Sequence, residues 1–210
     1  MVAPENRALE ASGTLINFGY GNLGDDVLYG TDDIDSLVGD NTLKPPAEST
    51  IVADDLVGGN DRIHGYAGDD IIHGGFGDDL LYGGDGDDDI YGQFGDDTIH
   101  GGAGEDTIYG DDVVTYGLMF GNDIIFAGED IDTVYGGKGD DKIYGEGGDD
   151  MLYGDAGEDI IYGGAGADTI DSGYGWDTIF GGDGCDTILA RDGGDVVWLG
   201  DCEEGAAVGD

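Results

Sequence analysis

The sequence predicts an all-β solenoid in which short parallel strands stack as coils, with two nonapeptide units in each coil. A nine-residue pattern, G-G-x-G-x-D-x-U-x with U a large aliphatic residue, recurs along most of the 210-residue chain. Each unit combines a glycine-rich turn with an alternating segment that is too short to be stable as an isolated strand. The units must therefore stack on one another, as in other repeat architectures, so that their aliphatic residues are buried together.

The register of the repeat is set by the aspartate at position 6. Eighteen units share it, and in every unit the residue two places later is Leu, Ile or Val, which excludes chance. The aspartates are Asp26, Asp35, Asp54, Asp61, Asp70, Asp79, Asp88, Asp97, Asp106, Asp123, Asp132, Asp141, Asp150, Asp159, Asp168, Asp177, Asp186 and Asp195. The aliphatic residues are Leu28, Leu37, Leu56, Ile63, Ile72, Leu81, Ile90, Ile99, Ile108, Ile125, Val134, Ile143, Leu152, Ile161, Ile170, Ile179, Ile188 and Val197.

Within each unit we expect a six-residue turn followed by a three-residue strand. Glycines at positions 1, 2 and 4 permit positive φ and a close approach of neighbouring backbones. Along D-x-U-x the side chains alternate, so that U points inward while positions 7 and 9 point outward. Two units close one coil, and successive coils stack at about 4.8 Å. The U side chains of the two resulting sheets then meet in a narrow apolar core.

The charge of the chain indicates which partners it takes. It contains 49 Asp and Glu but only 6 Lys and Arg, for a formal net charge of -43. This charge disfavours nucleic acid and anionic membrane surfaces and favours cations. No apolar run approaches the length of a membrane-spanning helix, so we expect no membrane insertion. Calcium takes six to eight oxygen ligands, and stacked turns place aspartates and exposed carbonyls around a common gap. We therefore expect multiple Ca²⁺ ions between the turns.

The pattern resembles the RTX (repeats-in-toxin, hemolysin-type) family of calcium-binding nonapeptide repeat proteins, over roughly residues 21–198. The resemblance implies a right-handed parallel β-roll with one Ca²⁺ between consecutive turns on each side. It also implies an extracellular protein, secreted from a Gram-negative bacterium by the type I route. The N-terminal stretch MVAPENRALEASG fits this route, because it lacks the pattern of a secretory signal peptide.

The predicted metal ligands are the position-6 aspartates named above together with backbone carbonyls at position 1. These carbonyls belong to Gly74, Gly83, Gly92, Gly101, Gly136, Gly145, Gly154, Gly163 and Gly181. Position 5 is often acidic too, as at Asp69 and Asp78. Because the family geometry gives the ligand role to position 6, we interpret the position-5 residues as solvated charges on the surface of the turn.

The chain divides into three predicted parts. Residues 1–20 form an N-terminal cap and a first strand, residues 21–198 form the roll, and residues 199–210 form a C-terminal cap or tail. Two spans inside the roll, 39–57 and 110–126, depart from the nine-residue spacing. Each holds either one unit with a protruding loop of eight to ten residues or a full degenerate coil, and the sequence does not decide between the two.

Aromatic residues and histidines recur at position 9, on the outer face of the predicted strands. Residues one coil apart should stack, which gives a ladder of Phe126, Tyr144, Tyr162, Phe180 and Trp198. Earlier ladders are His64–Tyr82–His100 and His73–Tyr91–Tyr109, and the span 110–126 leaves open which of them continues into the later one. Such a strip either supports the stacked strands or binds sugars by ring stacking.

Cys185 and Cys202 are separated in the sequence by almost the length of one coil. They form either a disulfide that closes the C-terminal end of the roll or two free thiols.

The sequence contains no recognisable catalytic motif. Paired carboxylates recur throughout the repeat, whereas a catalytic pair is expected to occur once in the chain. Only the short segment 1–20 precedes the roll, so we expect no catalytic domain and no enzyme activity in this chain. The sequence predicts calcium binding by an extracellular protein or module whose folding is driven by Ca²⁺. The alternatives are a calcium-folded accessory or secretion module of a larger enzyme, or an adhesin that binds glycans through the aromatic strip. Any glycan or protein partner is otherwise unknown.

Overall fold

The computed structural model describes residues 60–111 and 121–200, together with the backbone of four short strands nearer the N-terminus. These four strands are β1 (Ala8–Glu10), β2 (Asn17–Tyr20), β3 (Val27–Tyr29) and β4 (Asp35–Val38). The others are β5 (Arg62–Ala67), β6 (Ile71–Phe76), β7 (Leu80–Asp85), β8 (Asp89–Phe94), β9 (Thr98–Ala103), β10 (Thr107–Tyr109), β11 (Ile124–Glu129), β12 (Thr133–Lys138), β13 (Lys142–Gly147), β14 (Met151–Ala156), β15 (Ile160–Ala165), β16 (Thr169–Asp171), β17 (Thr178–Asp183), β18 (Thr187–Leu189) and β19 (Val196–Trp198). The described part of the chain contains strands and turns and no helix.

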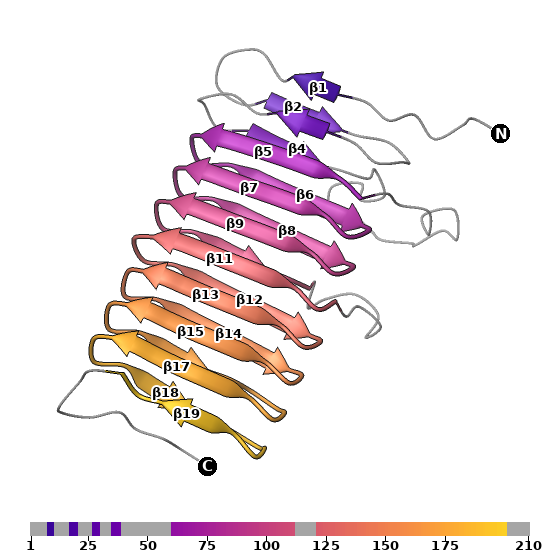
Figure 1. Cartoon of the computed structure of the whole chain (residues 1–210). Helices are drawn as coiled ribbons and strands as arrows, with labels where there is room; N and C mark the ends of the chain where they lie inside the picture. The colour runs from indigo at the N-terminus through magenta and orange to yellow at the C-terminus, as the bar shows by residue number, and fades with distance from the viewer. Residues whose placement is uncertain are drawn as a thin grey trace, which may run out of the picture.

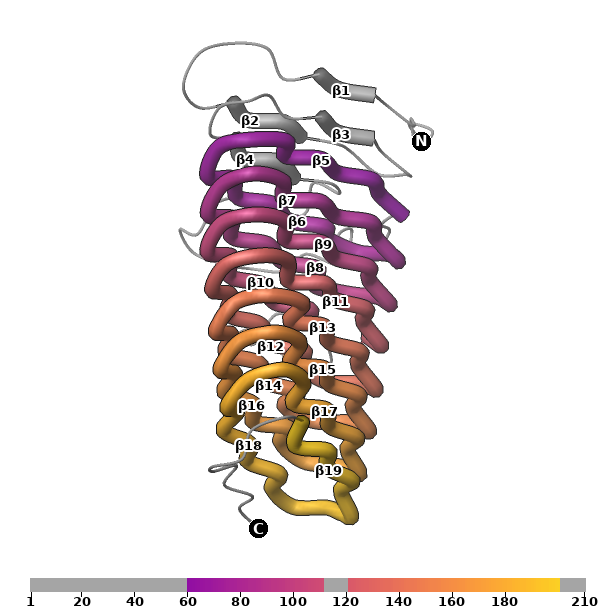
Figure 2. Tube along the Cα trace, turned by 60° about the vertical axis from the view of Figure 1, so that its left-hand side comes forward, coloured from indigo at the N-terminus to yellow at the C-terminus, as the bar shows by residue number. Residues whose placement is uncertain are grey.

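The strands form two parallel sheets. One sheet contains the ten odd-numbered strands in chain order and the other contains the nine even-numbered strands, so the chain crosses from one sheet to the other at every turn (Figure 1). We call them the odd sheet and the even sheet. Along the tube the chain winds as a stack of similar coils (Figure 2). This confirms the predicted parallel solenoid with two strands per coil.

The register of the ladders follows the repeat. Leu81 of β7 pairs with Ile99 of β9, and Ile72 of β6 pairs with Ile90 of β8, so each residue pairs with its equivalent two units further along the chain. Residues at the same position of the nonapeptide therefore lie directly above one another in successive coils.

Most strands from β5 onward are longer than the sequence predicted, whereas β10, β16, β18 and β19 have the predicted three residues. β7 spans six residues, and it pairs with β9 through positions 7 to 9 and again through positions 2 and 3. Gly83 at position 1 forms a corner, after which Gly84 at position 2 has φ +134°. A Cβ on Gly84 would overlap the carbonyl of Tyr66 in the previous coil. The glycines thus allow the backbone to turn the corner without leaving the ladder, and only positions 4 to 6 remain as turn.

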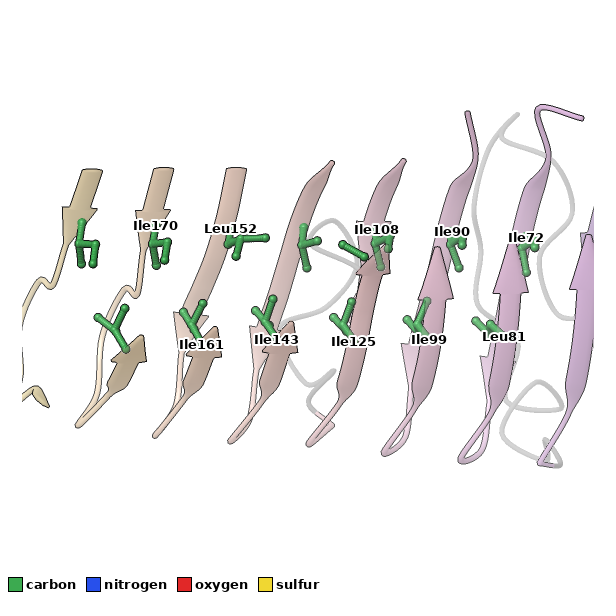
Figure 3. Packing of buried hydrophobic residues seen from close by; sticks show 14 of the residues in the cluster. Ile72, Leu81, Ile90, Ile99, Ile108, Ile125, Ile143, Leu152, Ile161 and Ile170 are labelled. Carbon is green, nitrogen blue, oxygen red and sulfur yellow. The ribbon is translucent and has the colours of Figure 1, made fainter. Parts of the chain in front are cut away.

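The core is a double row of position-8 side chains. From Ile63 to Ile188 all of them have an exposed fraction of 0%, and those of the two sheets face each other along the roll (Figure 3). Val197 of β19 is partly buried and packs against this row. Burial of one such side chain is worth about 1.5–3 kcal/mol. The core is only two side chains thick, so each coil depends on its neighbours for burial.

The strand pairing resolves the span 110–126. Ile125 of β11 pairs with Ile99 of β9, and Val134 of β12 pairs with Ile108 of β10, although both pairs are separated by nearly one unit more than a coil. Because β9 and β11 are direct neighbours, the extra sequence in this span adds no coil. The alternative of one unit with an inserted loop is therefore confirmed, and the degenerate coil is wrong. Residues 112–120 lie outside the described part.

The span 39–57 behaves similarly in the sheets. Leu28 of β3 pairs with Ile63 of β5, and Leu37 of β4 pairs with Ile72 of β6, although each pair is separated in the sequence by almost two coils. The predicted unit at Asp54 and Leu56 therefore adds no layer between these strands, and a degenerate coil at this level is wrong. Asp54 and Leu56 themselves lie outside the described residues, as does the whole segment 39–59.

Candidate metal-binding turns

The position-6 aspartates form two rows, one along each edge of the roll. We call the turns that precede odd strands the odd turns and those that precede even strands the even turns. From Asp61 to Asp186 every aspartate of these rows has an exposed fraction of 3% or less. Of the other predicted aspartates, Asp195 is partly exposed, Asp35 is described only as backbone, and Asp26 and Asp54 lie outside the described residues.

From Asp79 onward, one carboxylate oxygen of each of these aspartates accepts a hydrogen bond from the previous coil. The amide of Asp79 donates to Oδ1 of Asp97 at 2.8 Å, and the amide of Asp97 donates to Oδ1 of Asp123 at 2.8 Å. The same bond recurs between all consecutive odd turns from Asp61 to Asp195 and all consecutive even turns from Asp70 to Asp186. The described turns thus form thirteen gaps between consecutive coils, and each gap has one position-6 aspartate on either side.

The second oxygen, Oδ2, is buried without a hydrogen-bond partner. This holds for Asp88, Asp97, Asp106, Asp123, Asp132, Asp141, Asp150, Asp159, Asp168, Asp177 and Asp186. A buried polar atom without a partner costs about 1–3 kcal/mol, and more if it is charged. One such atom would be an accident, whereas a row of them on each edge of the roll indicates a missing partner common to all.

The position-1 glycines leave the space into which these oxygens point. A Cβ on Gly136 would lie 2.6 Å from Oδ2 of Asp141 and 3.0 Å from the carbonyl oxygen of Gly154. The carboxylate of one coil and the position-1 carbonyl of the next therefore face the same small space. The predicted position-1 carbonyls thus lie beside the predicted carboxylates, although the identity of the ligands stays a prediction.

Burial raises the pKa of these carboxyl groups well above the usual range. Desolvation, assisted by like charges in neighbouring turns, raises the pKa of Asp97 to about 10 and that of Asp123 to about 8. On the even side desolvation raises the pKa of Asp88 to about 7 and that of Asp106 to about 8. Hydrogen bonds from backbone amides act in the opposite direction but are weaker. In the folded chain these buried carboxyl groups are therefore stable only when they are protonated or when a cation balances their charge.

The donor set fits a hard cation. Within the described residues, no three side chains of His, Cys, Asp or Glu converge closely enough to hold a metal by themselves. An ion between two turns would therefore be held by two carboxylates and by backbone carbonyls, all of them oxygen ligands. Calcium prefers such a set, whereas zinc and copper favour nitrogen and sulfur.

Position 5 carries a second ladder that the sequence analysis missed. Oδ1 of Asp78 accepts a hydrogen bond from the amide of Asp96 at 3.1 Å. The exposed position-5 side chains thus accept from the next coil, whereas the position-6 side chains accept from the previous coil. Along the odd turns this ladder runs without a break from Asn60 to Glu158. The signal was present in the sequence, because Asn60 and Asn122 replace aspartate there and share its acceptor oxygen but not its charge. Position 5 is therefore a hydrogen-bonding position as well as a charged surface.

The aromatic ladders are continuous across the insertion. On the odd sheet His100 stacks on Phe126 with ring centroids 4.8 Å apart, so the ladder runs from His64 to Trp198. On the even sheet Tyr109 stacks on Tyr135 at 4.9 Å, and that ladder ends at Tyr153. Interplanar angles of 0–7° along the odd ladder mean that each ring covers the face of the next. Sugar stacking requires a free ring face, so the ladder favours the structural interpretation.

Beyond the even ladder, charge replaces aromatic stacking. Asp171 occupies position 9 after Tyr153 and accepts a bidentate ion pair from Arg191. Cys185, which directly precedes Asp186 in the next even turn, is disulfide-bonded. The only other cysteine of the chain is Cys202, which lies outside the described residues.

Comparison with known protein families agrees with this geometry. The family model for the RTX calcium-binding nonapeptide repeat (4 copies) matches residues 20–42, 57–81, 82–113, 119–152, 144–175, 153–188 and 171–201. The chain belongs to this family. The matches leave out residues 43–56, which contain the predicted unit at Asp54, in agreement with the strand pairing. No curated protein matches the chain. No helix long and apolar enough to cross a membrane occurs in the described part of this RTX chain.

Proposed function

We propose that this RTX chain binds several calcium ions between its stacked turns and folds around them outside the cell. The observation that carries the proposal is the double row of buried position-6 carboxylates from Asp88 to Asp186, whose Oδ2 atoms have no hydrogen-bond partner. Bound calcium supplies the positive charge and the demand for oxygen ligands that these rows match. The chain supplies paired aspartates at a fixed spacing and carbonyls from glycine-rich corners.

The electrostatics make the cation part of the scaffold. Carboxylates in successive coils lie about 5 Å apart, the strand spacing. At an effective dielectric constant of about 20, two charges at that distance repel by about 3 kcal/mol. Each of the thirteen described gaps therefore carries either this repulsion or the free-energy cost of keeping a carboxyl group protonated near neutral pH. At neutral pH the stack should therefore open when cations are removed.

Calcium linkage is large enough to drive folding. A site with free calcium at about ten times its Kd stabilises the folded state by about 1.4 kcal/mol. Thirteen such sites would add roughly 18 kcal/mol, more than the typical net stability of a domain. Extracellular calcium modules have Kd values of about 10⁻⁴–10⁻³ M, so a chain of this kind would stay unfolded at the low free calcium of a cytosol.

Two observations support an extracellular location. Cys185 is disulfide-bonded, and disulfides persist mainly in oxidising compartments. The chain also carries a net charge of -43, which bound divalent cations would reduce within a compact fold. We propose that the chain is secreted from a Gram-negative bacterium by the type I route, in an unfolded state, and that external calcium completes its folding.

A calcium titration of the chelated full chain tests the proposed function. Far-UV circular dichroism should show a cooperative gain of β-structure, and calorimetry should show several ions bound over the same range. Magnesium is the control, because its preference for near-ideal octahedral geometry and retained water makes it a poor fit for these turns. Identical spectra in chelator and in saturating calcium, without heat of binding, would contradict the proposal.

A further inference from the structure

The stack of even turns continues past the last strand. Trp198 of β19 pairs with Phe180 of β17, so Leu199 follows at position 1 of a further even turn. Gly200 at position 2 has φ +77°, and a Cβ on it would overlap the carbonyl of Gly182 in the previous coil. Position-2 glycines deeper in the roll make the same contact. Leu199 and Gly200, which the sequence analysis assigned to a terminal cap or tail, therefore still follow the register of the roll.

The last aspartate of the even row is buried. Asp186 has an exposed fraction of 1%, although the even row has no further aspartate at position 6. Asp195, which ends the odd row, is partly exposed. The end of the even row is therefore covered in a way that the end of the odd row is not.

The backbone at Leu199 covers Asp186 and completes a familiar geometry. A Cβ on Gly181 would overlap Oδ2 of Asp186 and would lie 2.9 Å from the carbonyl oxygen of Leu199. Gly136 has the equivalent two neighbours in its own gap between repeat turns. Oδ2 of Asp186 is also buried without a hydrogen-bond partner. A carboxylate oxygen and a position-1 carbonyl thus face the same small space here as in the gaps of the repeat.

The sequence after Gly200 offers the means to close this space. Counted on from Leu199, Cys202 falls at position 4 and Glu204 at position 6, both outside the described residues. Cys185, exposed at position 5 of the turn below, is disulfide-bonded, and Cys202 is the only other cysteine of the chain. Stacked turns lie about 5 Å apart, within the usual Cα separation of a disulfide, about 4.4–6.8 Å. Glu204 carries a carboxylate at the position where the repeat has aspartate.

We propose that the chain forms a further calcium site at this end, between the turn of Asp186 and the turn that begins at Leu199, and that a disulfide between Cys185 and Cys202 holds the second turn in place. The inference rests on the proposed function, since it presumes that stacked turns bind calcium. Asp186, the carbonyl of Leu199 and Glu204 supply the same types of oxygen ligand as a repeat gap.

The position of the site explains why it needs a covalent link. In the described part of the chain the even sheet ends at β18, so no strand stacks on the strand that follows Asp186. Inside the roll each turn is held by the coils on both sides, whereas the turn at Leu199 has a coil on one side only. A disulfide restricts the unfolded alternatives of this turn and so replaces the missing coil.

Diffraction from crystals of the full chain grown in calcium chloride tests the site directly. Anomalous density should lie between Asp186 and the carbonyl of Leu199. In calorimetric titrations Asp186→Asn should remove two bound ions, because Asp186 then borders a gap on each side. The matched control is Asp195→Asn, which should remove one ion because Asp195 ends its row. Circular dichroism in saturating calcium verifies that both variants fold.

The disulfide is tested separately. Peptide mapping without reduction should find Cys185 joined to Cys202. Replacement of both cysteines by serine should leave the fold intact in saturating calcium and remove density from the gap above Asp186 alone. Two free thiols, a bond between two chains, or density that persists in this gap without the disulfide would overturn its role.

The outcomes separate the two proposals. Calcium absent from every gap of the natural chain would refute the proposed function itself. Calcium in the repeat gaps but none above Asp186, or an equal loss of ions in folded D186N and D195N, would overturn only this inference. If D186N fails to fold, the density in the natural chain still decides, because an empty gap above Asp186 overturns the inference and an occupied one supports it.

Discussion

Replacement of Asp150 by asparagine measures what one position-6 carboxylate contributes. Asp150 has an exposed fraction of 1%, its Oδ1 accepts from the amide of Asp132 at 2.9 Å, and its own amide donates to Asp168 at 3.0 Å. Asparagine keeps the shape and the Oδ1 acceptor, and it removes the charge. Because Asp150 borders two gaps, two calcium sites lose a charged ligand at once.

The expected magnitude follows from linkage. If both sites cease to bind at a calcium concentration about ten times Kd, the folded state loses about 1.4 kcal/mol for each, or about 3 kcal/mol in total. For a chain of this length that corresponds to a fall in Tm of about 6–12 °C. Thermal unfolding followed by circular dichroism in saturating calcium measures the fall, and a calcium titration should show its midpoint shifted to higher concentration.

The neighbouring residue supplies the control. Asp149 lies at position 5, and its Oδ1 accepts from the amide of Ala167 at 2.7 Å. Asparagine occupies the same position at Asn60 and Asn122, where it accepts the equivalent bond. Asp149→Asn removes the same charge and should change Tm by less than about 2 °C. Equal effects of the two substitutions would show that net charge, and not ligation at position 6, controls stability.

Two further predictions follow from the same structure. In chelator, acidification should favour the folded state. The carboxyl pKa values in the fold range from about 6 for Asp168 to about 10 for Asp97, above the ordinary value of 3.8. Protonation therefore stabilises the fold fully below pH 3.8, and this stabilisation is lost as the pH rises through 6 to 10. Protons compete with calcium for the same oxygens, so the calcium midpoint should rise as pH falls, and a midpoint independent of pH between 6 and 9 would count against the buried carboxylates as ligands. In the core, Ile72→Ala should lower the free energy of unfolding by about 2–5 kcal/mol. Ile71→Ala, at a side chain with an exposed fraction of 42%, should lower it by less than about 1 kcal/mol. Equal losses of stability in urea unfolding would refute the assignment of the core face.

The repeat period predicted the main features of the fold because one local rule acts in every coil. Position 8 must be apolar to fill a core two side chains thick, so Ile99 and its equivalents mark the inner face without ambiguity. The same period placed the aspartates in two rows, since equal repeat positions stack in successive coils.

What the period did not predict depends on contacts between coils. Strand length was underestimated because Gly83 and Gly84 look like turn residues in the sequence, whereas in the stack they continue the ladder around a corner. The position-5 ladder joins a side chain such as Asp78 to an amide one coil away, so spacing alone does not reveal it. The two insertions were ambiguous because each irregular span is close to one coil in length, and only the pairing of β9 with β11 and of β3 with β5 decides the matter.

The central claim is that position-6 carboxylates of neighbouring coils share bound calcium, and diffraction from crystals grown in calcium chloride tests it most directly. Anomalous density at calcium should lie between consecutive turns, within about 2.3–2.6 Å of aspartate and carbonyl oxygens. Water or a lysine amine in those gaps, with calcium absent from both rows, would contradict the account.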